Sequence, residues 1–298
     1  MTLCEEKGHD GSMFYFLVFA LTVLAATPTP SKKVESYKDL ISKARHLTLQ
    51  RDRLQATQVL IRGIQRETRN TAAHKELVAA IDELSGAFYT EKAQSLFLLA
   101  DGLEYEKPKE SIEKLNEALR LEEGNVSILK ALGRSHLRLG ECSSASKHIF
   151  TARELNPYSA EIRLLNLQLA DCEKNAEQLT ALLSSKPDES DPSERFSKGI
   201  RLRELQRKGD LKGAKTLLAA WEAAQPDYPE VYLWKWALSG NSPTDRVAAR
   251  KYMSLCQNLT PRKKKSYNLD LELCKSVEKV DEALKSASSE GDSDDDSP

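Results

Sequence analysis

Three basic side chains, Lys130, Arg134 and Arg138, have the spacing in this 298-residue chain that most directly suggests a chemical role. They are four residues apart, so in a helix they lie on one face. Arg203 and Arg207 repeat this spacing. Arginine holds a carboxylate through two parallel hydrogen bonds, so such stripes would attract an acidic peptide or a peptide's carboxyl terminus. The alternative is that these bases are only the solvated face of an amphipathic helix.

The sequence contains none of the common motifs for catalysis or cofactor binding. The phosphate-binding P-loop, the dinucleotide motif G-x-G-x-x-G, the nucleophile motif G-x-S-x-G and the zinc motif H-E-x-x-H are all missing. The five histidines are scattered singly, and no C-x-x-C or H-x₃-H pair offers a metal site. We therefore expect a protein that is not an enzyme and that uses no cofactor or metal.

Residues 126–159 have the pattern of two helices joined by a turn. Apolar residues recur at three- and four-residue steps over residues 128–139, which is the period of an α-helix, and Gly140 follows as a stop signal. A second apolar stripe covers residues 145–152. It ends before Pro157, because the residue that precedes a proline avoids the helical conformation. Gly133 is small where the two helices must approach closely.

The same stretch resembles a repeat of the tetratricopeptide (TPR) family. Leu129, Leu132-Gly133 and His136 stand where the family has W-x₂-L-G-x₂-Y, Ala145 and Ile149 match its A-x₃-F, and Pro157 matches its closing proline. A single TPR unit cannot bury its apolar face alone, so the resemblance implies stacked neighbours. It also implies an all-α, TPR-like solenoid of helical hairpins.

Weaker units recur at about the 34-residue period of the family. They cover residues 37–70, 92–125, 160–186, 195–228 and 231–261, and the unit at 160–186 is shortened. Residues 71–91 fit no repeat register and predict one extra helix, at 72–84. A closing helix is expected over residues 269–287, and no alternating pattern predicts a strand. The expected solenoid therefore spans residues 31–286.

The resemblance also implies which residues face a ligand, because the first helix of each TPR hairpin lines a concave groove. The unit that starts at Lys92 would place apolar residues there, and the two basic stripes would lie farther along. An amphipathic or carboxylate-ended peptide would suit such a surface. The expected groove residues of the two basic units are Ser127, Lys130, Arg134, Leu137, Arg138, Phe196, Gly199, Arg203, Gln206 and Arg207.

The two ends of the chain differ from the body in composition. Residues 13–26, MFYFLVFALTVLAA, are too few for a membrane span of about 20 residues. They match the apolar core of a secretory signal peptide, so we expect residues 1–30 to direct export to the periplasm or the secretory pathway. The alternatives are an uncleaved membrane anchor and a capping helix packed on the first hairpin.

The carboxyl-terminal residues 287–298 form an acidic, low-complexity run that predicts a disordered tail. Its expected role is solubility. The alternative is that the tail folds back on the basic groove and competes with an acidic ligand.

Four cysteines follow the amino-terminal segment, at positions 142, 172, 256 and 274. An oxidising compartment would allow this even number to pair. Cys256 and Cys274 fall on helices that should be adjacent, so they are the better candidate pair. The alternative is that all four are buried as small hydrophobic residues.

These observations predict a non-enzymatic scaffold or adaptor that binds partner proteins through a peptide segment. A membrane-anchored assembly factor is one alternative, since residues 13–26 would hold the array at a membrane. A nucleic-acid or polyanion binder is the other. The near-zero net charge of −1 counts against it, and residues 262–265 are the only dense cluster of bases.

Overall fold

The computed structural model describes residues 35–69, 71–104, 106–184, 193–240, 246–259 and 273–289. Every regular element within these ranges is an α-helix, which confirms the predicted all-α class. None of the described helices is long and apolar enough to cross a membrane. Residues 1–30, the basic run 262–265 and the tail beyond Ser289 lie outside the described residues, so the predictions made for them stay predictions.

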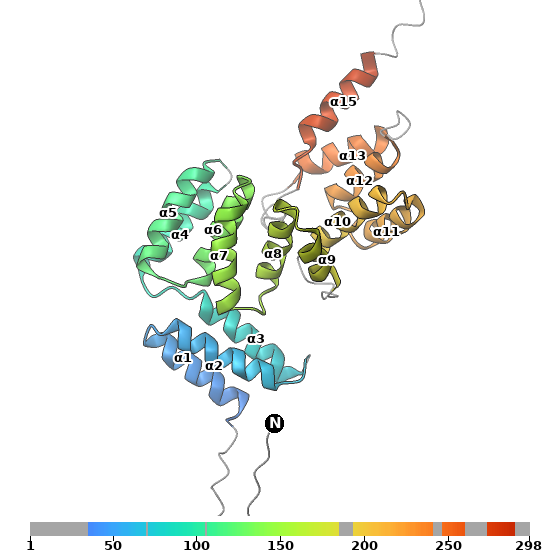
Figure 1. The fold of residues 1–298 in the computed structure, drawn as a ribbon. Coiled ribbons are helices and arrows are strands. Elements are labelled where there is room, and N and C mark those ends of the chain that lie inside the picture. Colours follow the sequence, from blue (N-terminus) through green and yellow to red (C-terminus); the bar gives the residue numbers. More distant parts are fainter. Residues whose placement is uncertain are drawn as a thin grey trace, which may run out of the picture. The chain divides into compact units, whose positions relative to one another are not determined.

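The helices pair into antiparallel hairpins along the chain (Figure 1). The first helix of each pair is α1 (Tyr37–Leu49), α4 (Glu91–Leu103), α6 (Val126–Arg138), α8 (Ala160–Cys172), α10 (Ser193–Arg207) or α12 (Pro229–Leu238). The corresponding second helix is α2 (Arg53–Arg66), α5 (Pro108–Leu121), α7 (Cys142–Leu155), α9 (Ala176–Ser184), α11 (Leu211–Ala224) or α13 (Arg246–Gln257). These pairs follow the predicted units.

Two helices stand outside the hairpin pairs. The extra helix predicted at 72–84 is α3 (Ala72–Ser85), which packs on both α1 and α2. The closing helix is α15 (Val277–Ser289), which packs on α13. It begins later than predicted, since residues 273–276 form a turn before it, and it continues to Ser289, so the first residues of the predicted tail are helical.

The α6–α7 hairpin shows how the sequence signals act. The side chain of Asn125 accepts hydrogen bonds from the backbone N–H groups of Ser127 and Ile128 and so caps the start of α6. The helices then cross closely at Gly133, where an added Cβ atom would lie 2.7 Å from Cγ1 of Ile149. Gly140 takes a φ of +74°, which suits glycine at the turn between the two helices.

Neighbouring hairpins share their buried residues. Ala145 and Ile149 of α7 pack with Leu165 and Leu169 of α8 in one apolar cluster. Helix α8 also contacts α6 on one side and α10 on the other. The hairpins from α4 to α13 therefore pack on their neighbours, as expected of a repeat array, whereas the α1–α2 hairpin packs on α3.

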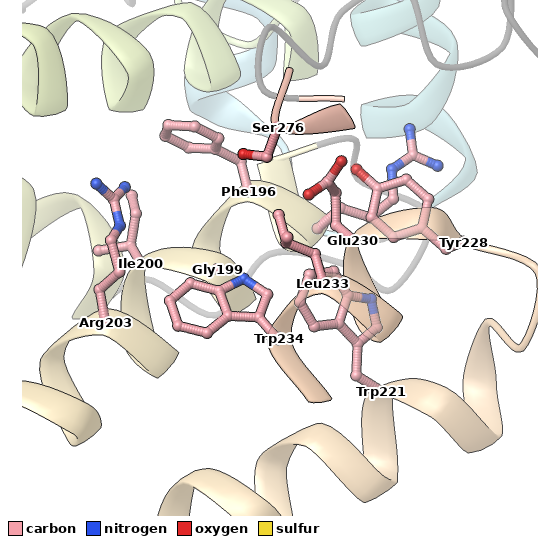
Figure 2. A pocket seen from close by; sticks show the side chains of 11 residues that line it. Phe196, Gly199, Ile200, Arg203, Trp221, Tyr228, Glu230, Leu233, Trp234 and Ser276 are labelled. Carbon is pink, nitrogen blue, oxygen red and sulfur yellow. The ribbon is translucent and has the colours of Figure 1, made fainter. Parts of the chain in front are cut away.

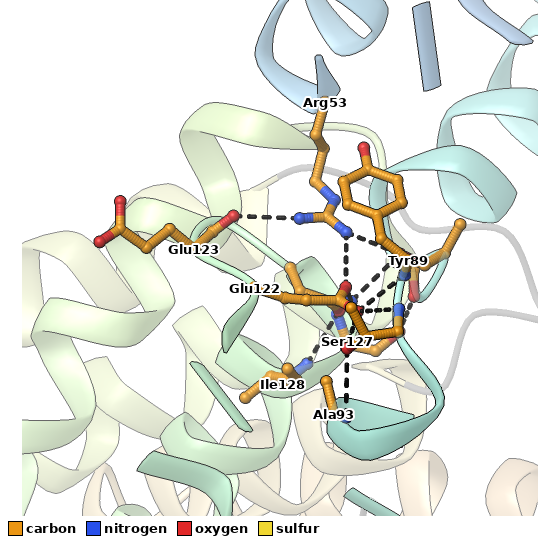
Figure 3. A network of polar contacts seen from close by, with 11 residues as sticks. Arg53, Tyr89, Ala93, Glu122, Glu123, Ser127 and Ile128 are labelled. Atoms are coloured by element: carbon orange, nitrogen blue, oxygen red, sulfur yellow. Dashed lines mark hydrogen bonds and ion pairs between the residues drawn. The ribbon is translucent and has the colours of Figure 1, made fainter. Parts of the chain in front are cut away.

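A buried polar network joins α2 to the connections on either side of the α4–α5 hairpin (Figure 3). The Glu122 carboxylate accepts hydrogen bonds from the backbone N–H groups of Tyr89 and Thr90 at 2.7 and 2.8 Å. It also accepts from Arg53 and Asn125, each at 3.1 Å. The Arg53 guanidinium lies over the Tyr89 ring, 4.2 Å from its centroid.

The electrostatics of Glu122 fit a structural role. Burial raises the pKa of this carboxyl, but the hydrogen bonds from Asn125, Thr90, Tyr89 and Arg53 together outweigh burial and hold the pKa below its ordinary value. The carboxylate therefore stays charged and holds the surrounding segments together.

All four cysteines of the helical body form disulfide bonds. Cys256 and Cys274, which were predicted to be the better candidate pair, are joined, with their Cα atoms 5.7 Å apart. Cys142 and Cys172 are also joined, which links the start of α7 to the end of α8 across a Cα–Cα distance of 5.9 Å. The alternative of four unpaired cysteines is wrong.

Candidate functional site

The predicted basic stripe of α6 lies on one helix face, but its members are paired with acidic residues of neighbouring hairpins. Arg134 donates to both carboxylate oxygens of Glu104, at 2.7 and 2.9 Å, and to Glu161 at 3.1 Å. Lys130 forms an ion pair with Glu161. Arg138 lies 3.3 Å from the same Glu104 carboxylate. These contacts connect α6 to the end of α4 and to the first turn of α8.

Arg134 is the buried centre of this network. Burial lowers its pKa, but the hydrogen bonds and charge of Glu104, with the charges of Glu161 and Asp101, outweigh burial and raise it. A peptide carboxylate could bind Arg134 only by displacing Glu104 or Glu161. The prediction that Lys130 and Arg134 contact a peptide stays untested.

The second basic stripe is more exposed. Arg203 donates to the Asp171 carboxylate of α8 at 2.9 Å, and Arg207 pairs with Glu204 of its own helix at 2.9 Å. Exposed ion pairs of this kind contribute little to stability and exchange readily with another charged group. Both arginines can therefore change partners at low cost.

A first cavity, of about 150 Å³, lies where α10, α11 and α12 meet (Figure 2). Its apolar lining includes Phe196 and Trp234. Gly199 leaves room at the wall, since an added Cβ atom would come 3.8 Å from Nε1 of Trp234. The full lining is Arg195, Phe196, Gly199, Ile200, Arg203, Trp221, Tyr228, Glu230, Leu233, Trp234 and Ser276.

A second cavity, of about 380 Å³, adjoins α6, α8 and α10. It is lined by Leu137, Arg138, Gly140, Gln168, Asp171, Cys172, Phe196, Leu273 and Lys275. Phe196 lines both cavities, and the turn at residues 273–276 borders both. We call the surface made by these two cavities the Phe196 groove. Most of its lining comes from α6, α8, α10 and α12, which are first helices of successive hairpins, whereas Trp221 comes from the second helix α11.

The structure divides the predicted site residues into two groups. Leu137, Arg138 and Arg203 line the Phe196 groove, together with Phe196 and Gly199. Lys130 and Arg134 belong instead to the ion-pair network with Glu104 and Glu161. Ser127, Gln206 and Arg207 are outside the lining of both cavities.

Several groove residues were missed in the sequence. Gln168 and Asp171 come from the shortened unit, where no groove positions were assigned, and Leu273 and Lys275 follow the last repeat. Trp234 packs on the apolar cluster of α10, α11 and α12 and also lines the first cavity. Trp236 does pack against the closing helix, at Val280. A signal for Gln168 and Asp171 was present, since α8 directly follows the best-formed unit.

Comparisons with known proteins add little to this description. Neither protein-family models nor curated proteins match the sequence. Among solved structures, the chain is similar to a tetratricopeptide repeat protein from Parabacteroides merdae. The sequence identity is 15%, the TM-score is 0.46, and the match covers 84% of this chain and 98% of the other. So distant a likeness carries no argument about the site, and the fold assignment rests on the helices themselves.

Proposed function

We propose that this protein is a scaffold that binds a peptide segment of a partner protein in the Phe196 groove. The observation that carries the proposal is that the two cavities share Phe196 in their linings and draw most of their other lining residues from the first helices of four successive hairpins. Recognition grooves of this kind take an apolar side chain in a pocket and use a few polar groups to orient it.

The charges around the groove favour a particular kind of peptide. Arg138 and Lys275 border the second cavity, and Arg203 borders the first. The carboxylate in the second cavity, Asp171, accepts a hydrogen bond from Arg203. Glu230 of the first cavity accepts a hydrogen bond from the Cys274 N–H. The apolar and cationic side chains of the lining therefore suit an apolar side chain next to a carboxylate. The proposed ligand is therefore an acidic peptide or a peptide's free carboxyl terminus.

Two random peptide libraries test this proposal. They share their sequences, but one ends in a free carboxylate and the other in an amide. We expect the immobilised protein to enrich free-carboxylate peptides with an apolar last residue, or peptides with an acidic residue beside an apolar one. The binding proposal is wrong if neither library gives enrichment above a blank surface.

Point variants locate the binding. For a peptide enriched in that selection, Arg138→Ala or Arg203→Ala should weaken binding by roughly ten- to a hundredfold, since a hydrogen bond to a charged group contributes about 1.5–3 kcal/mol. Arg207→Ala is the matched control. It removes an arginine from the same helix as Arg203, but outside both cavities. An equal loss in all three variants would indicate long-range attraction without a defined site.

We also propose that the protein is exported. The apolar run at residues 13–26 supports this, as do the two disulfide bonds, because disulfides persist mainly in oxidising compartments. Mass spectrometry of the mature amino terminus, combined with cell fractionation, tests the proposal. Cleavage near residue 26 is expected. An intact Met1 in a cytoplasmic fraction would contradict it, and an intact run in the membrane fraction would indicate an anchor.

A further inference from the structure

The short turn Leu273–Ser276 closes the Phe196 groove on one side. Leu273 packs on the apolar cluster formed by α10, α11 and α12, which includes Leu202 and Val231. Leu273 and Lys275 line the second cavity, and Ser276 lines the first. Figure 2 shows Ser276 on a segment across the cavity from Trp234. The turn therefore limits access to the surface on which the proposed peptide would bind.

Two backbone hydrogen bonds fix the turn. The N–H of Cys274 donates to Oε1 of Glu230 at 2.7 Å, and the N–H of Ser276 donates to the Tyr252 hydroxyl at 3.2 Å. Both acceptors are buried. Glu230 belongs to α12 and Tyr252 to α13, so the turn is attached to the last hairpin.

The disulfide bond to Cys256 is the covalent part of this attachment. Cys274 has a φ of +59°, in the left-handed region that a residue with a side chain rarely adopts. Such a conformation persists only where the surroundings impose it. The cross-link to α13, together with the two hydrogen bonds, holds Cys274 there. Without the cross-link, we expect the backbone at Cys274 to leave the left-handed conformation, because a residue with a side chain rarely adopts it.

We propose that the Cys256–Cys274 disulfide is a redox latch that holds residues 273–276 over the Phe196 groove and opens the groove when it is reduced. This regulation rests on the proposed peptide-binding function of the groove. In the reaction, a dithiol reductant donates two electrons and two protons. The disulfide becomes two thiols, and the reductant becomes a disulfide.

The packing around the turn suggests that opening is local. Val277 and Val280 of α15 pack with Trp236, Ala249 and Tyr252 in a separate apolar cluster. None of these residues belongs to the turn itself. The closing helix can therefore stay in place while the turn leaves the groove, as in a local unfolding step.

Acrylamide quenching of tryptophan fluorescence measures the opening directly, whether or not a peptide binds. The chain has three tryptophans. Trp221 and Trp236 are buried, and only Trp234 is partly exposed, at the wall of the first cavity. We expect reduction with a phosphine to raise the quenching constant of the wild-type protein. Trp221 also lines this cavity but is buried, so the Trp234→Phe variant should lose most of this rise, which assigns the signal to the groove.

Removing the other disulfide, Cys142–Cys172, shows whether the change in quenching comes from Cys256–Cys274 alone. In the Cys142→Ser/Cys172→Ser variant, Cys256–Cys274 is the one disulfide left among the described residues, and reduction should still raise quenching. The Cys256→Ser/Cys274→Ser variant should show high quenching already before reduction and no further rise. Helical circular dichroism checks that each variant folds. Hydrogen exchange on the wild-type protein adds a second measurement, in which reduction should remove the protection of the Cys274 and Ser276 amides.

Unchanged quenching and unchanged amide protection after full reduction of the wild-type protein would overturn the latch. A failed latch and a failed binding site are distinguishable. If peptides bind equally with and without reductant while quenching stays constant, the proposed function stands and the latch is wrong. If quenching rises but no peptide binds in either state, the turn moves as proposed and the groove serves no peptide.

Discussion

Arg134 Nε donates a hydrogen bond to Glu104 Oε1 over 2.7 Å, and both side chains are almost wholly buried, with 7% and 4% of their surface exposed. Each residue comes from a different hairpin. A buried charge that loses its partner is strongly destabilising, by about 3–5 kcal/mol. We expect Arg134→Met to lower the free energy of unfolding by this amount in urea titrations.

The double variant Arg134→Met/Glu104→Met should be destabilised by less than the sum of its two single variants, because the singles each leave a buried charge behind. Arg207→Met, which removes an exposed arginine paired within its own helix, should change stability little. Additive effects of Arg134 and Glu104 would show that the pair is not coupled as the structure indicates.

Two helical glycines should respond in opposite directions to alanine. At Gly133 the new Cβ atom would lie 2.7 Å from Ile149 Cγ1, so Gly133→Ala should destabilise by about 1–3 kcal/mol through overpacking. At Gly102 no atom of the described residues, apart from its chain neighbours and its own helix backbone, lies within 4 Å of the new Cβ atom, so Gly102→Ala should stabilise by about 0.4–1 kcal/mol. Thermal unfolding measures both. Adding Ile149→Val to Gly133→Ala should recover part of the loss, and failure to do so would place the strain elsewhere.

The free energy of unfolding should decrease as the pH is lowered, because His148 is partly buried in its neutral form. The His148 ring stacks on His136, with centroids 5.6 Å apart and planes at 6°. Burial, followed by the charges of His136 and Lys147, lowers the pKa of His148 from its ordinary 6.5 to about 4. Between these values the unfolded chain binds a proton that the folded protein does not, so stability declines as pH falls from about 6.5 towards 4.

The urea midpoint of the wild-type protein should therefore drop between pH 7 and pH 5, and His148→Gln should reduce that drop. His46→Gln, at an exposed position of α1, is the control and should leave the drop unchanged. An identical pH dependence in all three proteins would contradict the role given to His148.

Glu122 should add a second pH dependence at more acidic pH. Its folded pKa lies below the ordinary value of 4.5, so its contribution is complete above about pH 4.5 and is lost as pH falls through the lowered pKa. Glu122→Gln should lower stability at pH 7 by about 1.5–3 kcal/mol, because an amide replaces a charged acceptor. It should also flatten the stability profile below pH 4.5. The adjacent exposed Glu123→Gln should do neither.

The hairpins could be predicted because their signals are local. Gly133, Gly140 and Pro157 mark a close approach, a turn and a helix end within a single unit, and the structure has each of these features. The extra helix α3 was also evident, since its apolar period fits no repeat register.

The site was only partly predictable because its decisive contacts are not local. The partners that bury Arg134 lie 30 and 27 residues away, in neighbouring hairpins, and a helix-face pattern alone cannot show that they meet it. Leu273 reaches the groove from a turn beyond the last repeat, where no family position describes it. Arg138 and Arg203 were assigned to the groove because they lie on the first helices of their units. That assignment needs only the position of a residue in its repeat and no knowledge of contacts between hairpins.

The Cys142–Cys172 bond has a mechanical consequence. Its two ends are separated by 30 residues that include most of α7 and α8. A force applied to the ends of the chain would pass through the sulfur atoms and leave this segment unloaded. Stretching would then release roughly 100 Å less length than the same chain without the bond, at about 3.3–3.6 Å per residue. The junction between the best-formed hairpin and its neighbour would carry tension without coming apart.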